Sequence, residues 1–287
     1  METSKDATRS DNSYMFDHES GAEMVRLLDQ DRLVTKAMGG LLPARSNDFT
    51  GIERILDVGC GPAGWTQEVA FAHQDIDIVG IDISEAMIEY ARAQAAAQGL
   101  ENAQFRVMDI TKTLDFPDNS FDFVNARLLG FFSPAFWPKL LQEYLRVTRP
   151  GGLICLTETE MGLSNSAALE KWYGWFFRAL WNVGQSFSPN GQRLNITAVL
   201  ASLLRRAGCR DVRVKAYAID WSLGSDDYYA SAQDYKAAFQ LLQPFFINAK
   251  VATKEEIEQA YEQFQVDLLQ DDFSAIHYML SAWGEKP

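Results

Sequence analysis

One segment indicates how this chain folds: Ile55-Leu56-Asp57-Val58-Gly59-Cys60-Gly61-Pro62-Ala63-Gly64-Trp65. It opens with a short apolar run that is typical of a buried strand, and a helical pattern follows its glycines. Gly59 and Gly61 let the backbone take positive φ and pass close to a ligand, because glycine has no Cβ. The first N–H groups of the next helix lack partners within the helix and suit an anionic group. We therefore expect a strand–turn–helix unit that binds a ligand at its turn, with a purely structural glycine turn as the alternative.

Asp57 distinguishes between two kinds of ligand at this turn. Gly59, Gly61 and Gly64 also satisfy GxGxxG, the spacing of dinucleotide-binding proteins. A carboxylate two residues before the first glycine would crowd the pyrophosphate of a dinucleotide. The same carboxylate attracts the ammonium group of a zwitterionic amino-acid tail. The residues around the turn therefore favour a ligand with such a tail.

Strands and helices alternate along the chain. Short β-branched runs predict strands at 54–58, 76–82, 104–108, 121–126 and 153–158. Helical patterns lie before and between them, at 21–38, 65–73, 84–98 and 135–147. After residue 158 the pattern predicts helices at 166–185, 195–207, 231–247 and 254–269, and strands at 212–219 and 273–283. Such alternation indicates a parallel sheet that is covered by helices on both faces.

The glycine segment resembles the first motif of class I S-adenosylmethionine-dependent methyltransferases, (I/V)LD(V/I)GCGxG. The resemblance covers residues 54–158 and extends more loosely over the remainder. It implies a Rossmann-like α/β fold, with a doubly wound, mostly parallel seven-stranded sheet and helical cap insertions. It also implies S-adenosyl-L-methionine as the cofactor and in-line methyl transfer as the reaction.

The chain is expected to form a single methyltransferase domain over residues 1–287. Its expected parts are N-terminal cap helices in 1–50, a cofactor-binding core in 51–158, and substrate-cap insertions in 159–195 and 222–271. The lid over the methyl acceptor is expected in the aromatic helix at 166–185. The aromatic residues of that helix are Trp172, Tyr173, Trp175, Phe176, Phe177 and Trp181. The alternative is that these side chains pack into the body of the protein.

Three acidic residues end strands and are expected to meet at one edge of the sheet. Asp57, Asp82 and Asp109 all project from the carboxyl edge, where ligands bind in open α/β sheets. Asp82 can accept two hydrogen bonds from the ribose hydroxyls, each contributing about 1.5–3 kcal/mol, and Ser84 after it suits a helix N-cap. By the resemblance, Asp109 accepts a hydrogen bond from the adenine amino group. Its alternative role is to cap the following turn.

The resemblance assigns further cofactor contacts. Met87 would lie against the adenine face, the Ile110 N–H would reach the ring, and Asn125 would lie beside the methionine portion. Tyr14 and Arg26 would reach the cofactor carboxylate. The full expected set is Tyr14, Arg26, Asp57, Gly59, Gly61, Asp82, Ile83, Met87, Asp109, Ile110 and Asn125. The alternative role for Met87 is packing in the core. The alternative for Tyr14 and Arg26 is a position on a solvated helix face.

The sequence marks no general base. The sulfonium cofactor is intrinsically reactive, so the enzyme has to align a nucleophile behind the methyl at about 3–3.5 Å and exclude water. Arg127, Glu158 and Glu160 are the candidates near the reaction centre. Arg127 has a surface carboxylate as its alternative partner. His73 and His277 lack a catalytic context and are expected to be structural.

Composition favours a small acceptor, and the aromatic residues at 166–185 favour one that is aromatic or apolar, with a cationic or flat molecule as a further alternative. The formal net charge is −13, whereas proteins that bind nucleic acid need a basic face. The longest apolar runs are far shorter than a membrane span. The three cysteines form no CxxC pair, so neither a metal site nor a disulfide framework is expected. Because the chain opens without an apolar signal core, we expect it in the cytoplasm, without a membrane partner.

Two other functions are alternatives at this point. A nicotinamide-dependent oxidoreductase would share GxGxxG and Asp82, but the sequence lacks a Tyr-x-x-x-Lys pair. A non-catalytic S-adenosylmethionine-binding protein would keep the fold without turnover. Binding of S-adenosylmethionine without binding of NAD would exclude the oxidoreductase. Detection of any methylated product would exclude the non-catalytic protein.

Overall fold

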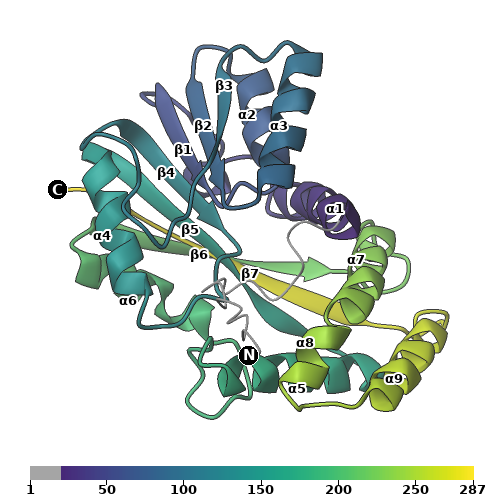
Figure 1. Ribbon diagram of the computed structural model, residues 1–287. Coiled ribbons are helices and arrows are strands. Elements are labelled where there is room, and N and C mark those ends of the chain that lie inside the picture. The colour runs from purple at the N-terminus through teal and green to yellow at the C-terminus, as the bar shows by residue number, and fades with distance from the viewer. Residues whose placement is uncertain (1–20) are drawn as a thin grey trace, which may run out of the picture.

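A seven-stranded sheet forms the centre of the computed structural model, which describes residues 21–287. The strand order is β3-β2-β1-β4-β5-β7-β6 (Figure 1). The first five strands are parallel, and β7 runs antiparallel to both β5 and β6. The strands are β1 Arg54–Val58, β2 Asp77–Asp82, β3 Ala103–Val107, β4 Phe121–Arg127, β5 Thr148–Ser164, β6 Arg210–Asp220 and β7 Ala275–Glu285. The expected doubly wound, mostly parallel sheet is confirmed.

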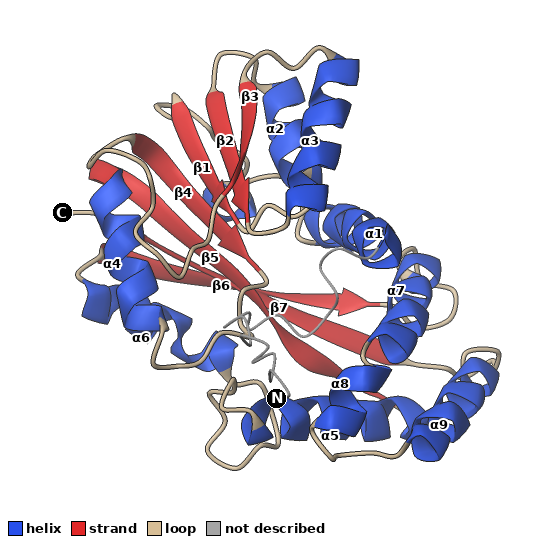
Figure 2. Cartoon of the chain, viewed as in Figure 1, coloured by secondary structure: helices blue, strands red, loops and turns tan. Residues whose placement is uncertain are grey.

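Helices cover both faces of this sheet, α2 and α3 on one face and α4 and α6 on the other (Figure 2). Ile55 of β1 packs toward α2 and α3, whereas Leu56 and Val58 pack toward α4, because successive strand side chains point to opposite faces. The helices are α1 Gly21–Ala37, α2 Gly64–Ala72, α3 Glu85–Gln98, α4 Trp137–Val147, α5 Ala167–Asn182, α6 Ile196–Ala207, α7 Tyr228–Leu241, α8 Gln243–Asn248 and α9 Lys254–Asp267, with a 3-10 turn, η1, at Pro43–Arg45. Within residues 21–287, no helix combines the length and apolar character that crossing a membrane requires.

The chain reverses its direction of travel across the sheet between β1 and β4. From β1 it winds outward through β2 to β3, then returns to β4 on the other side of β1 and continues to β5. Ligands of open α/β sheets bind at such a switch, outside the carboxyl ends of the strands. The register places Asp57 beside Asn125 across the β1–β4 pair. The expected binding edge therefore lies at this switch.

The strand β5 is longer than its sequence pattern indicates. We expected it over 153–158, but it continues to Ser164 because β7 pairs with it along this length. The register shifts between Glu160 and Leu163, and Gly162 there passes so close to β7 that a Cβ would lie 1.4 Å from the Ile276 carbonyl oxygen. The extended part of β5 carries the sheet beyond the Rossmann-like core.

A group of helices that we call the cap, α1, α5, α7, α8 and α9, lies beyond the carboxyl ends of β1, β2 and β4 (Figure 2). Within it α1 packs against α7, and α5 packs against α9. The helix expected at 231–247 is two helices, because Pro244 lies in the first turn of α8, where it needs no N–H partner.

The aromatic residues of α5 are mostly buried. Trp172 stacks on Phe176 with 5.5 Å between ring centroids, and it also contacts Phe239 of α7 and Phe246 of α8. Trp181 at the end of the helix is 42% exposed. Most of these side chains therefore pack into the body of the protein, which was the alternative to a lid.

Candidate active site

The glycine turn follows β1 in a conformation that favours glycine. Gly59 has φ +69° and Gly61 has φ +53°. The N–H groups of Gly59 and Cys60 donate to the Ile81 carbonyl oxygen at 2.8 and 2.9 Å, which fixes the turn to the end of β2. A Cβ at Gly59 would lie 2.8 Å from the Leu129 side chain. The missing side chain therefore allows Leu129, in the loop after β4, to pack against the turn.

Asp82 joins the glycine turn to the start of α3. One carboxylate oxygen accepts a hydrogen bond from the Gly61 N–H and the other from the Ser84 N–H, both at 2.9 Å. The Ser84 side chain in turn accepts from the Met87 N–H at 3.2 Å, so the expected N-cap is confirmed. An ionised carboxylate offers about four acceptor positions, so it can accept ribose hydroxyls in addition to backbone N–H groups. Asp82 thus faces the site in a fixed orientation.

Asp57 is buried, with 5% of its surface exposed. Its two oxygens accept hydrogen bonds from the Thr66 hydroxyl at 2.5 Å and from the Asn125 side-chain amide at 2.9 Å. Burial raises the pKa of this carboxyl to about 6, against the opposing effect of the two hydrogen bonds. The carboxylate therefore stays mainly ionised at neutral pH. It connects α2 and β4 to the end of β1 as well as adding negative charge to the site.

Asp109 lies just beyond β3, where its carboxylate accepts from the Thr111 N–H at 2.9 Å and the Thr111 hydroxyl at 2.7 Å. Lys112 adds an ion pair at 3.3 Å. These partners hold the pKa of Asp109 below its ordinary value even though partial burial acts in the opposite direction. The turn-capping role that the sequence left as an alternative is present. Asp109 also lines the cavity described next.

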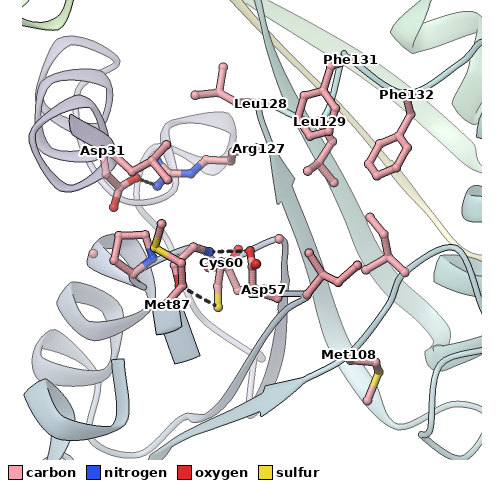
Figure 3. Close-up of a pocket in the computed structure, with 18 of the residues that line it drawn as sticks. Asp31, Asp57, Cys60, Met87, Met108, Arg127, Leu128, Leu129, Phe131 and Phe132 are labelled. Atoms are coloured by element: carbon pink, nitrogen blue, oxygen red, sulfur yellow. Dashed lines mark hydrogen bonds and ion pairs between the residues drawn. The ribbon is translucent and has the colours of Figure 1, made fainter. Parts of the chain in front are cut away.

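A cavity of about 500 Å³ opens at this edge of the sheet (Figure 3). Such a volume lies in the usual range for small-molecule and cofactor sites. Eight of the expected cofactor residues line it: Asp57, Gly59, Gly61, Asp82, Ile83, Met87, Asp109 and Ile110. Asn125 reaches it through the hydrogen bond to Asp57. Tyr14 lies outside the described residues. We call this space the first cavity.

Arg26 does not line the first cavity. Its guanidinium pairs with Glu23 at 2.7 Å and with Asp234 of α7 at 2.9 Å. The pairing fastens α1 to α7 at a second cavity of about 160 Å³. The two cavities share a wall formed by Leu27, Gln30, Val34, Leu128 and Phe131.

The second cavity is largely apolar, with polar groups that come from four distant parts of the chain. Thr159 and His277 come from neighbouring strands, and Tyr235 comes from α7. Tyr173 donates to the Tyr235 hydroxyl at 3.0 Å, and Tyr235 hydrogen-bonds with His277 Nδ1 at 2.9 Å. His277 Nε2 hydrogen-bonds with Thr159. The sequence did not single out Tyr235, because it lies within an ordinary helical pattern.

Burial lowers the pKa of His277 to about 4, so the imidazole is neutral at physiological pH. Both of its ring nitrogens are occupied by Tyr235 and Thr159. In this arrangement His277 forms part of the cavity wall.

The three catalytic candidates lie in different surroundings. The carboxylate of Glu160 accepts from the N–H groups of Leu194 and Asn195 at 2.9 and 2.8 Å, just before α6, and lines neither cavity. Arg127 lines the first cavity and forms an ion pair with Asp31. Asp31 is thus a carboxylate partner of the kind that the sequence left as the alternative for Arg127.

Glu158 lines the second cavity with 2% of its surface exposed. Its carboxyl group accepts a hydrogen bond from the Leu129 N–H at 2.7 Å, which holds the loop after β4, whose residues line both cavities. Burial raises the pKa of Glu158 to about 8, against the opposing effect of the Leu129 and Gly130 N–H groups. A large part of the Glu158 population is therefore protonated at neutral pH.

Glu158→Gln is expected to remove a pH dependence of stability. The pKa of this carboxyl is about 8 in the folded protein and near 4.5 in the unfolded chain, so folding takes up a proton in between. The resulting stabilisation is fully present below the unfolded pKa and is lost as the pH rises through the folded pKa. Between about pH 5 and pH 8 the wild-type free energy of unfolding should fall relative to that of the variant. Urea titrations at several pH values measure this, and parallel curves for the two proteins would contradict it.

Comparison with known proteins assigns the family. A sequence profile described as "Methyltransferase domain" matches residues 55–152. The chain is 31% identical over 175 residues to the demethylmenaquinone methyltransferase of Geobacillus stearothermophilus, and the match spans 58% of this chain and 74% of that protein. The chain belongs to the S-adenosylmethionine-dependent methyltransferases. The methyltransferase is also 39% identical over 124 residues to the aklanonic acid methyltransferase DauC of Streptomyces sp. (strain C5), across 42% of this chain and 54% of that protein.

Solved structures agree on the fold of the methyltransferase. Phosphoethanolamine N-methyltransferase 2 of Haemonchus contortus, in complex with S-adenosyl-L-methionine, superposes with a TM-score of 0.56 at 17% identity. The superposition covers 94% of this chain and 57% of that one. The cofactor of the methyltransferase is S-adenosyl-L-methionine. The family assignment excludes the alternative that the protein is a nicotinamide-dependent oxidoreductase.

Proposed function

We propose that this methyltransferase moves the methyl group of S-adenosylmethionine, by in-line displacement, to a small aromatic or apolar acceptor in the second cavity. The shared wall of the two cavities carries the proposal. A molecule in the second cavity lies next to one in the first, and a nucleophile must approach the methyl at about 3–3.5 Å. The proposal places the cofactor in the first cavity and the acceptor in the second.

The lining of the second cavity supports an apolar acceptor. Trp172, Phe176 and Leu180 of α5 line it, together with Met161 and Met279. Small-molecule sites typically combine such a lining with a few polar groups that fix orientation. Glu158 is the catalytic candidate whose carboxyl group belongs to this wall, and the proposal assigns it contact with the acceptor.

The names of the relatives and the charge of the chain support the same acceptor class. Two relatives are named for small molecules, demethylmenaquinone and aklanonic acid. The net charge of −13 opposes binding to nucleic acid phosphates.

In the first cavity the proposal keeps the roles expected from the sequence. Asp82 accepts the ribose hydroxyls, Asp109 accepts the adenine amino group, and Met87 and Ile110 contact the adenine ring. All four line the cavity and lie on the side where β2 and β3 end.

A labelled-methyl transfer screen tests the proposed function. Purified methyltransferase is incubated with S-adenosylmethionine that carries a labelled methyl group and with small phenols, enols and amines of apolar character. We expect label in a product extracted into organic solvent. The proposal is wrong if none of these acceptors takes the label while a protein or RNA acceptor does.

Phe176→Leu and Trp175→Leu form a matched pair once an acceptor is found. Phe176 lines the second cavity, whereas Trp175, in the same helix, packs toward Phe246 and is not part of that lining. The loss of an aromatic contact of 0.5–1.5 kcal/mol should raise the acceptor KM of Phe176→Leu about 2- to 10-fold. Trp175→Leu should lower the unfolding midpoint and leave that KM near the wild-type value. Equal KM changes in both variants would make Phe176 a core residue only.

A further inference from the structure

We propose that Arg127 and Asp31 clamp the zwitterionic amino-acid tail of the cofactor, with the tail carboxylate on Arg127 and the tail ammonium on Asp31. Asp57, which the sequence pattern placed at the ammonium, has its two oxygens bound by Thr66 and Asn125 and adds only its negative charge. In the structure Arg127 and Asp31 pair directly with each other in the wall of the first cavity, Arg127 from the end of β4 and Asp31 from α1 (Figure 3). The proposal concerns the cofactor side of the site and does not depend on the identity of the acceptor.

The position of Arg127 selects it for the tail. Among the residues of 21–287 that line the first cavity, the cations are Arg127 and Lys112. Lys112 is 77% exposed and pairs with Asp109 beyond β3, away from the glycine turn. Arg26, which the resemblance assigned to the cofactor carboxylate, is engaged by Glu23 and Asp234 at the second cavity. Arg127 is therefore the described cation that the tail carboxylate meets beside the glycine turn.

The guanidinium of Arg127 is held in place by contacts that do not involve Asp31. Its Nη1 donates to the Thr35 hydroxyl of α1 at 3.0 Å, and its carbon lies 5.6 Å from the centre of the Trp65 ring. Asp31 binds the other nitrogen, Nη2. That nitrogen can exchange one carboxylate for another while the Thr35 and Trp65 contacts keep the guanidinium oriented.

Asp31 occupies a position that suits a carboxylate. Its second oxygen lies against Gly64, the first residue of α2, so close that a Cβ there would be 2.5 Å away. The N-terminal end of a helix carries a partial positive charge, which adds to that of Arg127. When the tail carboxylate enters this position, Asp31 is displaced toward the tail ammonium. The charges balance, because the cation Arg127 then pairs with the tail carboxylate and the anion Asp31 pairs with the tail ammonium.

Three nucleosides separate the two arms of the clamp. S-Adenosylhomocysteine carries both tail charges, decarboxylated S-adenosylmethionine carries only the ammonium, and 5′-methylthioadenosine carries neither. The affinity of each is measured by isothermal titration calorimetry, without any methyl acceptor. The variants are Arg127→Met and Asp31→Asn, with Arg149→Met as the control, because Arg149 lies at the opposite edge of the sheet and pairs with Asp122.

Arg127→Met should weaken S-adenosylhomocysteine about 10- to 100-fold, as the loss of a charge-assisted hydrogen bond requires. It should leave 5′-methylthioadenosine and decarboxylated S-adenosylmethionine within about twofold of the wild-type affinity. Asp31→Asn should weaken the two ligands that carry the ammonium and spare 5′-methylthioadenosine. Arg149→Met should change none of the three.

Equal weakening of all three ligands by Arg127→Met would overturn the proposal, because Arg127 would then only support the fold of the site. Unchanged affinity for S-adenosylhomocysteine would overturn it as well. If Arg127→Met does not bind 5′-methylthioadenosine, Arg127→Gln is measured in its place. That variant removes the positive charge but keeps a polar amide that can hydrogen-bond with Thr35, so the same selective loss is required of it.

Discussion

Asp82→Ala is expected to abolish measurable binding of S-adenosylhomocysteine while the circular dichroism spectrum stays that of the folded protein. Two hydrogen bonds from the ribose to a charged group contribute about 1.5–3 kcal/mol each, so the loss of both weakens binding roughly 100- to 10,000-fold. The Gly61 and Ser84 N–H groups lose their acceptor in the same step. The glycine turn is then less ordered before the ligand arrives, which adds to the loss.

The control for this variant is Asp77→Ala. Asp77 begins the strand that Asp82 ends, lies at the opposite edge of the sheet and is exposed. Its removal should leave the affinity unchanged. Asp82→Ala should also weaken 5′-methylthioadenosine as much as S-adenosylhomocysteine, because both carry the ribose. If Asp82→Ala binds S-adenosylhomocysteine with near-normal affinity, Asp82 does not accept the ribose hydroxyls.

Gly162→Ala is expected to have the largest effect on stability. A Cβ at Gly162 would overlap the Ile276 backbone, at 1.4 Å from its carbonyl oxygen, and a strand backbone cannot yield as a flexible side chain does. The register between β5 and β7 must then shift or open. Overpacking typically costs 1–3 kcal/mol and occasionally more. We expect about 3 kcal/mol or more here, measured as a shift of the urea midpoint at constant m-value.

Gly174→Ala provides a control with the opposite sign. Gly174 lies in the middle of α5, and nothing lies within 4 Å of a Cβ placed there. Alanine loses less conformational freedom than glycine on helix formation, so the protein should gain about 0.5–1 kcal/mol. If Gly162→Ala does not lower the midpoint, the close approach of β5 to β7 is wrong.

Local pattern was enough to predict the core of the fold. The strand at 54–58 has the bounds that its apolar run indicates. The glycine turn and the acidic strand ends could be read from the sequence because each depends on neighbours only a few residues away. Parallel strands end at one edge, so the convergence of Asp57, Asp82 and Asp109 followed from strand order without knowledge of the packing.

The contacts that complete the site follow from tertiary packing alone. Arg26 meets Asp234 across 208 positions of the chain, and Arg127 meets Asp31 across 96. Such pairs leave no periodic signal, because periodicity records only the face that a residue occupies within its own element. For the same reason the sequence did not show that Tyr235 and His277 would meet in the second cavity.

The alternation of apolar and polar residues established the sheet, its covering helices and the edge at which the cofactor is proposed to bind. The second cavity was decided by tertiary structure, through the pairing of β5 with β7 and the packing of the cap against that edge. The same packing pairs Arg26 with Glu23 and Asp234, away from the first cavity. Helices and strands form from interactions between near neighbours, whereas a cavity is the space left between surfaces that the chain brings together over long distances. That space depends on the volumes and charges of side chains that have no common position in the sequence.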